Sequence, residues 1–77
     1  MSQFISDITL HINEDTSHNE RESLRDVLLD MNGVICADCH DEHPHLMVVA
    51  YDPDLVNSME FISTMNTNGK HAQLVGL

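Results

Sequence analysis

The sequence predicts an α+β fold in which two helices cover one face of a four-stranded antiparallel sheet. Two stretches have apolar residues at helical spacing, four others have the pattern of strands, and their order is strand, helix, strand, strand, helix, strand. A chain of 77 residues has room for one modest core. We therefore expect residues 1–77 to form a single domain.

The first half of the chain begins with a strand and a helix. Alternation of apolar and polar residues over 7–12 predicts a strand with one buried face. Ser17, followed three residues later by Glu20, is a capping-box signal for a helix start. A helix near residues 18–32, ended by Gly33, would then carry an apolar stripe, namely Leu24, Val27, Leu28 and Met31.

The middle of the chain predicts a β-hairpin. Residues 34–39 look extended, residues 41–44 have the chemistry of a turn, and residues 45–51 form a second apolar, β-branched run. The first of these two strands would lie at an edge of the sheet.

The last third predicts a helix and a closing strand. Asp52 before Pro53 suggests a cap followed by the first helical position. Residues 71–77 give the final strand after Gly69. Between Pro53 and Gly69 we expect a helix with one apolar stripe, namely Leu55, Met59, Ile62 and Met65.

This βαββαβ order is typical of two interleaved right-handed βαβ units, which is the ferredoxin-like architecture. Short landmarks stand at the ends of the expected elements: Gly33 with Val34, residues 49–53, Gly69, and residues 74–77. At this spacing they resemble the heavy-metal-associated domain family, the fold of small copper chaperones and of metal-binding modules of metal-pumping ATPases. The resemblance implies a metal-binding Met-x-Cys-x-x-Cys between the first strand and first helix. Here that loop, residues 13–20, contains no cysteine, so the two-thiolate copper(I) site is missing from its place.

The balance of charged residues limits the classes of partner that this chain can bind. Three basic residues against thirteen acidic ones give a net charge of −10 with histidine neutral, which disfavours nucleic acid and membrane surfaces. Cations and basic protein surfaces remain. We find no signal peptide and no apolar run long enough to span a membrane, and we expect a soluble, cytoplasmic protein.

The densest cluster of metal-ligand residues lies in the hairpin and consists of Cys36, Cys39, His40, His43 and His45. Thiolate and imidazole suit zinc, nickel or copper. On a regular strand Cys36 faces outward and Cys39 inward, so the two thiols would not share an ion. A compact site would use the three histidines, with Asp41 or Glu42. The alternative is that the thiols are ordinary structural residues and the histidines are solvated.

Other chemistries fit less well. Residues 36–40 match the Cys-x-x-Cys-His pattern of c-type haem attachment, but the expected strand and the lack of an export signal argue against it. A thioredoxin-like use would need a helix N-terminus beside the thiols. The loop between the first strand and helix offers another set of ligands for zinc or manganese, or simply an acidic helix start: Glu14, Asp15, His18 and Glu20.

The sequence therefore favours a small acidic module that binds a divalent transition metal through the hairpin histidines and Cys36. An alternative is a metal-independent protein-interaction module, with possible homodimers formed through the edge strand or through an open sheet face containing Leu46, Val48 and Ala50. An ACT-like regulatory domain shares the same element order. We expect no enzymatic activity, since the chain has no nucleophile–base set and no glycine-rich phosphate loop.

Overall fold

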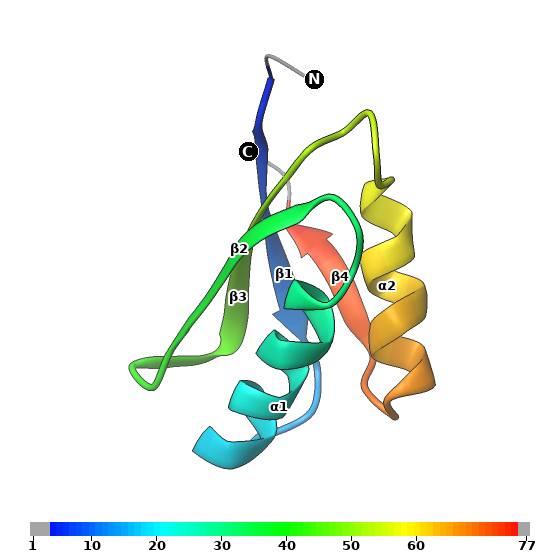
Figure 1. Cartoon of the computed structure of the whole chain (residues 1–77). Helices are drawn as coiled ribbons and strands as arrows, with labels where there is room; N and C mark the ends of the chain where they lie inside the picture. The colour runs from blue at the N-terminus through cyan, green and yellow to red at the C-terminus, as the bar shows by residue number, and fades with distance from the viewer. Residues whose placement is uncertain (1–3, 76–77) are drawn as a thin grey trace.

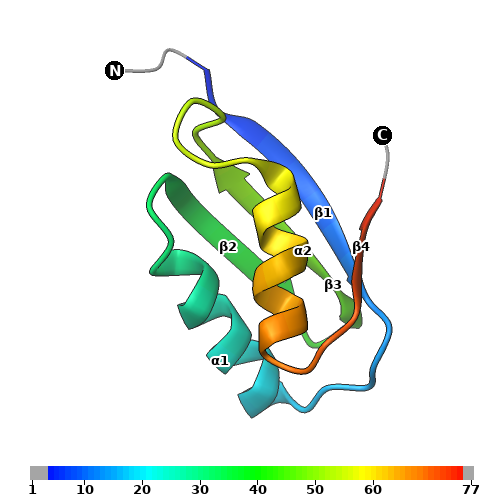
Figure 2. The same ribbon diagram turned by 90° about the vertical axis from the view of Figure 1, so that its right-hand side faces the viewer.

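The structure, a computed structural model, describes residues 4–75 and confirms the predicted fold class. The elements are β1 (Ser6–Ile12), α1 (His18–Leu29), β2 (Val34–His40), β3 (His43–Tyr51), α2 (Ser58–Thr67) and β4 (Ala72–Val75). The strands form one antiparallel sheet in the order β2-β3-β1-β4, so β2 is an edge strand as expected. Both helices lie on one face of this sheet (Figures 1 and 2). The end of the predicted final strand, Gly76 and Leu77, lies outside the described residues.

The core lies between the sheet and the two helices. Leu10 and Met47 contribute from the sheet, and Leu28 and Phe61 from the helices; none is more than 1% exposed. The Phe61 ring meets Tyr51 edge to face at a centroid distance of 5.1 Å. Burial of these side chains is the main favourable term that holds the two layers together. Within residues 4–75 no helix has the length and apolarity that crossing a bilayer requires.

The predicted cap of α1 is confirmed, but its end is shorter than expected. The Ser17 hydroxyl accepts the Glu20 backbone N–H at 3.2 Å, and the Glu20 carboxylate accepts the Ser17 N–H at 3.0 Å. The helix ends at Leu29 rather than at residue 32. The following turn reaches Gly33 at a φ of +99°, a conformation that glycine adopts without steric cost.

The predicted start of α2 at Pro53 is wrong. The Asp52 side chain instead accepts the Asp54 N–H at 2.9 Å and forms a turn. The helix begins at Ser58, behind a capping box made by Asn57 and Glu60.

This later start changes which side chains are buried. Leu55 and Met59, expected on the buried stripe, are 57% and 58% exposed. Val56 and Phe61 are buried instead, while Met65 is buried as predicted. Ile62 packs partly against the core.

The hairpin turn is also tighter than predicted. Only residues 41–42 form the turn, and β3 already begins at His43. Pro44 has no backbone N–H, and its position in β3 is not one of the paired positions of either neighbouring strand. The pairing of β1 with β3 extends only to Leu46, and the register of β2 with β3 shifts beside the turn. The Pro44 carbonyl accepts the Thr16 hydroxyl at 3.2 Å.

Candidate functional site

All six histidines of the chain lie at one end of the fold, which we call the histidine end. They are His11, His18, His40, His43, His45 and His71. This end contains the β1–α1 loop, the β2–β3 turn and the α2–β4 loop (lower part of Figure 1). It is the same end at which the family resemblance predicts a metal site.

One acid in the β1–α1 loop binds the α2–β4 loop. The Glu14 carboxylate accepts two hydrogen bonds from His71, one from the backbone N–H at 2.7 Å and one from the ring Nδ1–H at 2.5 Å. These hydrogen bonds, the side-chain one above all, lower the pKa of Glu14 to about 2. The two loops are therefore joined by a charge-assisted contact.

A second acid of the same loop faces His45. His45 donates Nδ1–H to the Ile12 carbonyl at 2.6 Å and stacks on the His11 ring at a centroid distance of 5.6 Å. Its Nε2 lies 3.2 Å from Asp15 Oδ1. The His45 ring is thus held in one orientation, with its second nitrogen directed at a fully exposed carboxylate.

A third contact joins α1 to the hairpin turn. Arg21 is 5% exposed and donates to the Thr16 carbonyl at 2.5 Å and to Asp41 at 2.7 Å. His18 also donates to Asp41, at 2.9 Å, and this contact raises the pKa of His18. The same two donors lower the pKa of Asp41. Asp41, considered above as a metal ligand, is therefore already shared by two cationic groups.

The structure separates the two cysteines, as the strand geometry predicted. Cys36 is exposed and pairs with Ala50, whereas Cys39 pairs with the buried Met47 and packs partly against the core. Burial raises the pKa of the Cys39 thiol. The two sulfurs cannot bind one ion in this backbone conformation, because they lie on opposite faces of the sheet.

The predicted histidine ligands are only partly brought together. His40 and His43 are cross-strand partners beside the turn and are both exposed. His45 is engaged with Asp15 rather than with them. Within residues 4–75, no group of three or more His, Cys, Asp and Glu side chains is arranged to hold a metal ion. The 36–45 cluster is therefore not a preassembled site.

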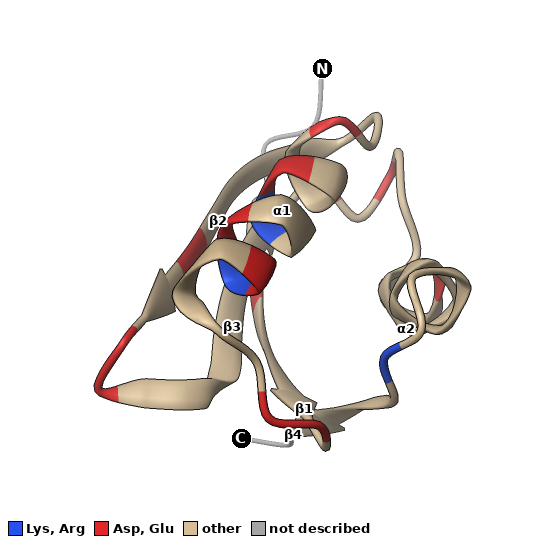
Figure 3. Cartoon of the chain, turned by 90° about the horizontal axis from the view of Figure 1, so that it is seen from below, with Lys and Arg blue, Asp and Glu red and all other residues tan. Residues whose placement is uncertain are grey.

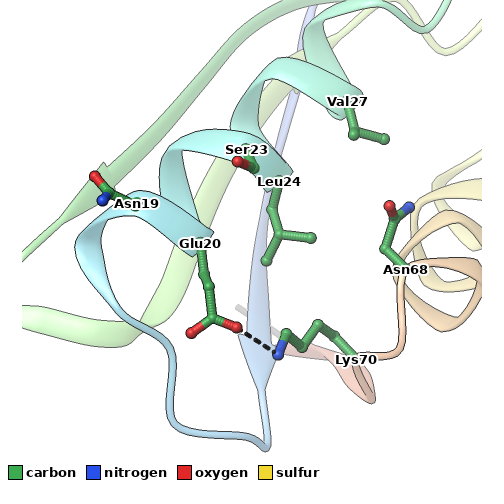
Figure 4. Close-up of a pocket in the computed structure, with 7 residues that line it drawn as sticks. All are labelled: Asn19, Glu20, Ser23, Leu24, Val27, Asn68 and Lys70. Carbon is green, nitrogen blue, oxygen red and sulfur yellow. Dashed lines mark hydrogen bonds and ion pairs between the residues drawn. The ribbon is translucent and has the colours of Figure 1, made fainter.

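A groove between the helices is less promising. It has a volume of about 320 Å³ and is lined mainly by α1 and by the segment after α2 (Figure 4). Its charged residues, Glu20 and Lys70, form an ion pair at 3.0 Å. Because these two charges neutralise each other, the groove presents no unpaired charged side chain that would select a charged ligand.

Comparison with known proteins shows a shared fold. No protein-family model matches this chain, and no curated protein matches it in sequence. Among solved structures, it is similar to oxidized MerP from Ralstonia metallidurans CH34, with a TM-score of 0.85 and 15% identity over 95% of this chain and 100% of that one. A copper binding domain from HMA7, a P-type ATPase, gives a TM-score of 0.82 and 21% identity over 91% and 93% of the two chains. The N-terminal domain of PacS from Synechocystis PCC6803 gives a TM-score of 0.77 and 15% identity over 92% of this chain and 98% of that one. The chain thus has the fold of heavy-metal-associated domains, as its landmarks indicated.

Proposed function

We propose that this chain is a binding module for a divalent transition metal, Zn²⁺ or Ni²⁺, held at the histidine end. The first two ligands are His45 Nε2 and the Asp15 carboxylate. His40 and His43, beside the turn, are the further protein ligands that we expect. The structural neighbours support this proposal because one of them is described as a copper binding domain of a P-type ATPase.

The observation that carries the proposal is the geometry of His45 and Asp15. Two ligands about 2.0–2.1 Å from a tetrahedral zinc ion are about 3.3–3.4 Å apart. The His45 Nε2 to Asp15 Oδ1 distance of 3.2 Å is close to that separation, so an ion could bind between these two atoms with little movement.

The surroundings of His45 support the same assignment. Histidines that bind metals usually donate their other ring N–H to a carbonyl or carboxylate, which fixes the tautomer and the ring orientation. His45 does this through Nδ1–H and the Ile12 carbonyl. Nε2, which faces Asp15, is then the ring nitrogen that is available to a cation.

The ligand types favour a divalent ion over copper(I). Imidazole and carboxylate suit zinc and nickel, whereas copper(I) prefers thiolates. A site with few protein ligands keeps positions open for water or for a ligand from another molecule. We therefore propose a carrier or sensor of metal and not an enzyme or a structural zinc fold.

The test is a residue-resolved NMR titration of the reduced protein with Zn²⁺ and then Ni²⁺ under chelator competition. We expect saturable shifts around residues 12–15 and 43–46. Asp15→Asn and His45→Ala should each weaken binding by about tenfold or more. His71→Ala is the matched control, because His71 also pairs with a carboxylate of the same loop, and it should leave affinity unchanged.

Three results would contradict the proposal. These are a lack of saturable shifts, weak shifts spread evenly over the six histidines, or an Asp15→Asn variant that binds as tightly as the wild type. Because the fully exposed Asp15 side chain has no structural role in the core, the last result would not reflect unfolding.

A further inference from the structure

The opposite end of the molecule has an exposed apolar surface, which we call the apolar end. Its residues are between 53% and 74% exposed, while every other exposed large apolar side chain of the described part is at most 41% exposed. They are Phe4, Ile5, Ile35, Leu55 and Met59.

The topology brings these residues together. Tyr51 on β3 pairs with Ser6 on β1 and with Val34 on β2, so these three residues form one row across the sheet. Ile5 and Ile35 are each one residue away from this row along their own chain segments. Leu55 packs over the backbone of the α1–β2 loop, since a Cβ on Gly33 would stand 2.8 Å from the Leu55 Cβ. Met59 lies in the first turn of α2, and α2 begins at the end of the molecule opposite the histidine end (Figure 1).

The charged residues around this surface are acidic. Carboxylates occur on β1, at the end of α1, in the β3–α2 loop and in the first turn of α2, namely Asp7, Asp30, Asp52, Asp54 and Glu60. None of these five appears in an ion pair within residues 4–75.

All three basic side chains of the chain are used elsewhere. Arg21 bonds Asp41 and Thr16, Lys70 pairs with Glu20, and Arg25 donates to the Ala37 carbonyl at 2.7 Å. Figure 3 shows the basic positions confined to α1 and the segment after α2. The apolar end therefore combines exposed apolar side chains with carboxylates, which we call its rim, and the three basic side chains are engaged elsewhere.

We infer that the apolar end is a docking surface for a basic, amphipathic protein segment. An apolar centre with a polar rim is the usual anatomy of a protein interface, and exposed apolar patches commonly mark such sites. Lysine or arginine on the partner would complement the carboxylate rim and increase the association rate. A second copy of this chain fits less well, because it would bring the same carboxylates and no basic side chain of its own to this surface.

The probe for the test is a synthetic 18-residue helix-forming peptide with leucine on one face and lysine on the other. An otherwise identical peptide with glutamate in place of lysine is the control. Titration of the ¹⁵N-labelled protein should shift resonances of Ile35, Leu55 and Met59. The histidine end should not respond, the glutamate peptide should not bind, and added salt should weaken binding.

Two variants distinguish binding at the apolar end from a general attraction of the lysine peptide to an acidic protein. The double variant Leu55→Gln with Met59→Gln keeps the charge and should weaken binding about tenfold or more, because it removes two apolar contacts. Val48→Thr is the matched control, since Val48 is 41% exposed on the open sheet face, and should bind like the wild type.

The inference would be overturned if the double variant bound the lysine peptide normally or if the shifts spread over all acidic regions. It would also be overturned if sedimentation showed a wild-type dimer that the double variant abolishes, because the occupant would then be a second copy. None of these outcomes involves the metal ligands, so they are independent of the proposed metal function.

Discussion

The two ends of this molecule are held together in different ways. At the histidine end, one backbone hydrogen bond, from the Asn13 N–H to the His71 carbonyl, is reinforced by charged side-chain contacts, namely Glu14 with His71 and Arg21 of α1 with Asp41. At the apolar end, backbone contact joins the loops, since the Asp52 N–H donates to the Gly33 carbonyl at 2.8 Å. Contacts at the histidine end therefore depend on the protonation of side chains, whereas the geometry of the apolar end depends on the shape of the backbone.

The largest expected effect compares one glycine from each end. Gly33→Ala should destabilise the protein by about 3 kcal/mol, because the new Cβ would combine a positive φ with overpacking. Leu55 and Val56 side-chain atoms would lie at 2.8–3.0 Å from that Cβ. Gly69 also has a positive φ, of +79°, but a Cβ there meets nothing within 4 Å, so Gly69→Ala should cost only about 1 kcal/mol. Urea denaturation measures both, and equal losses would show that close packing at the apolar end is unimportant.

The second effect tests whether a single side chain holds the histidine end together. Arg21→Met should cost about 2 kcal/mol, since it leaves the Thr16 carbonyl and Asp41 without their buried donor. Lys70→Met, which breaks the more exposed pair with Glu20, should cost about 0.5 kcal/mol. Comparable losses in chemical denaturation would contradict a special role for Arg21.

The third effect is the pH dependence of the Glu14 contact. A folded pKa of about 2, below the ordinary 4.5, means that this contact stabilises the fold above pH 4.5 and is lost as the pH falls toward 2. Thermal melts of wild type and Glu14→Gln should therefore differ most near pH 5 and converge near pH 2. Parallel curves over that range would contradict the prediction. Variants of the apolar end should show no such convergence, because its loops are joined through the backbone.

The smallest effect concerns His18. Its raised pKa means that the contact with Asp41 contributes stability below pH 6.5 and loses it as the pH rises through the raised value. An NMR titration of the imidazole should give a pKa above the ordinary value in the wild type. The value should decrease in Asp41→Asn, and an unchanged value would show that Glu22 or the overall charge is responsible.

Much of the fold could be predicted from local chemistry. The alternation of β1 and the Ser17–Glu20 capping box each depend on residues a few positions apart, and the structure reproduces both. The start of α2 could not be decided this way, because Asp52 before Pro53 is equally good as a turn or as a helix cap. The capping box at Asn57 and Glu60 formed instead, since it lets Val56 and Phe61 into the core.

The candidate site was less predictable because its residues are distant in sequence. Asp15 and His45 are thirty positions apart, and nothing in their spacing indicates that they meet. The strand register brings them together: His11 pairs with Leu46, which places His45 beside the end of β1 and the loop that follows. The sequence did predict the separation of Cys36 from Cys39, because strand periodicity alone determines it.

The separation of the two thiols has a practical consequence for labelling and storage. Cys36 is exposed on the open face, whereas Cys39 is partly buried and has a raised pKa. A maleimide dye should therefore modify Cys36 first and give a singly labelled protein without mutagenesis. In air the same thiol is the one placed to form an intermolecular disulfide, so a covalent dimer that disappears with reductant would report oxidation and not self-recognition.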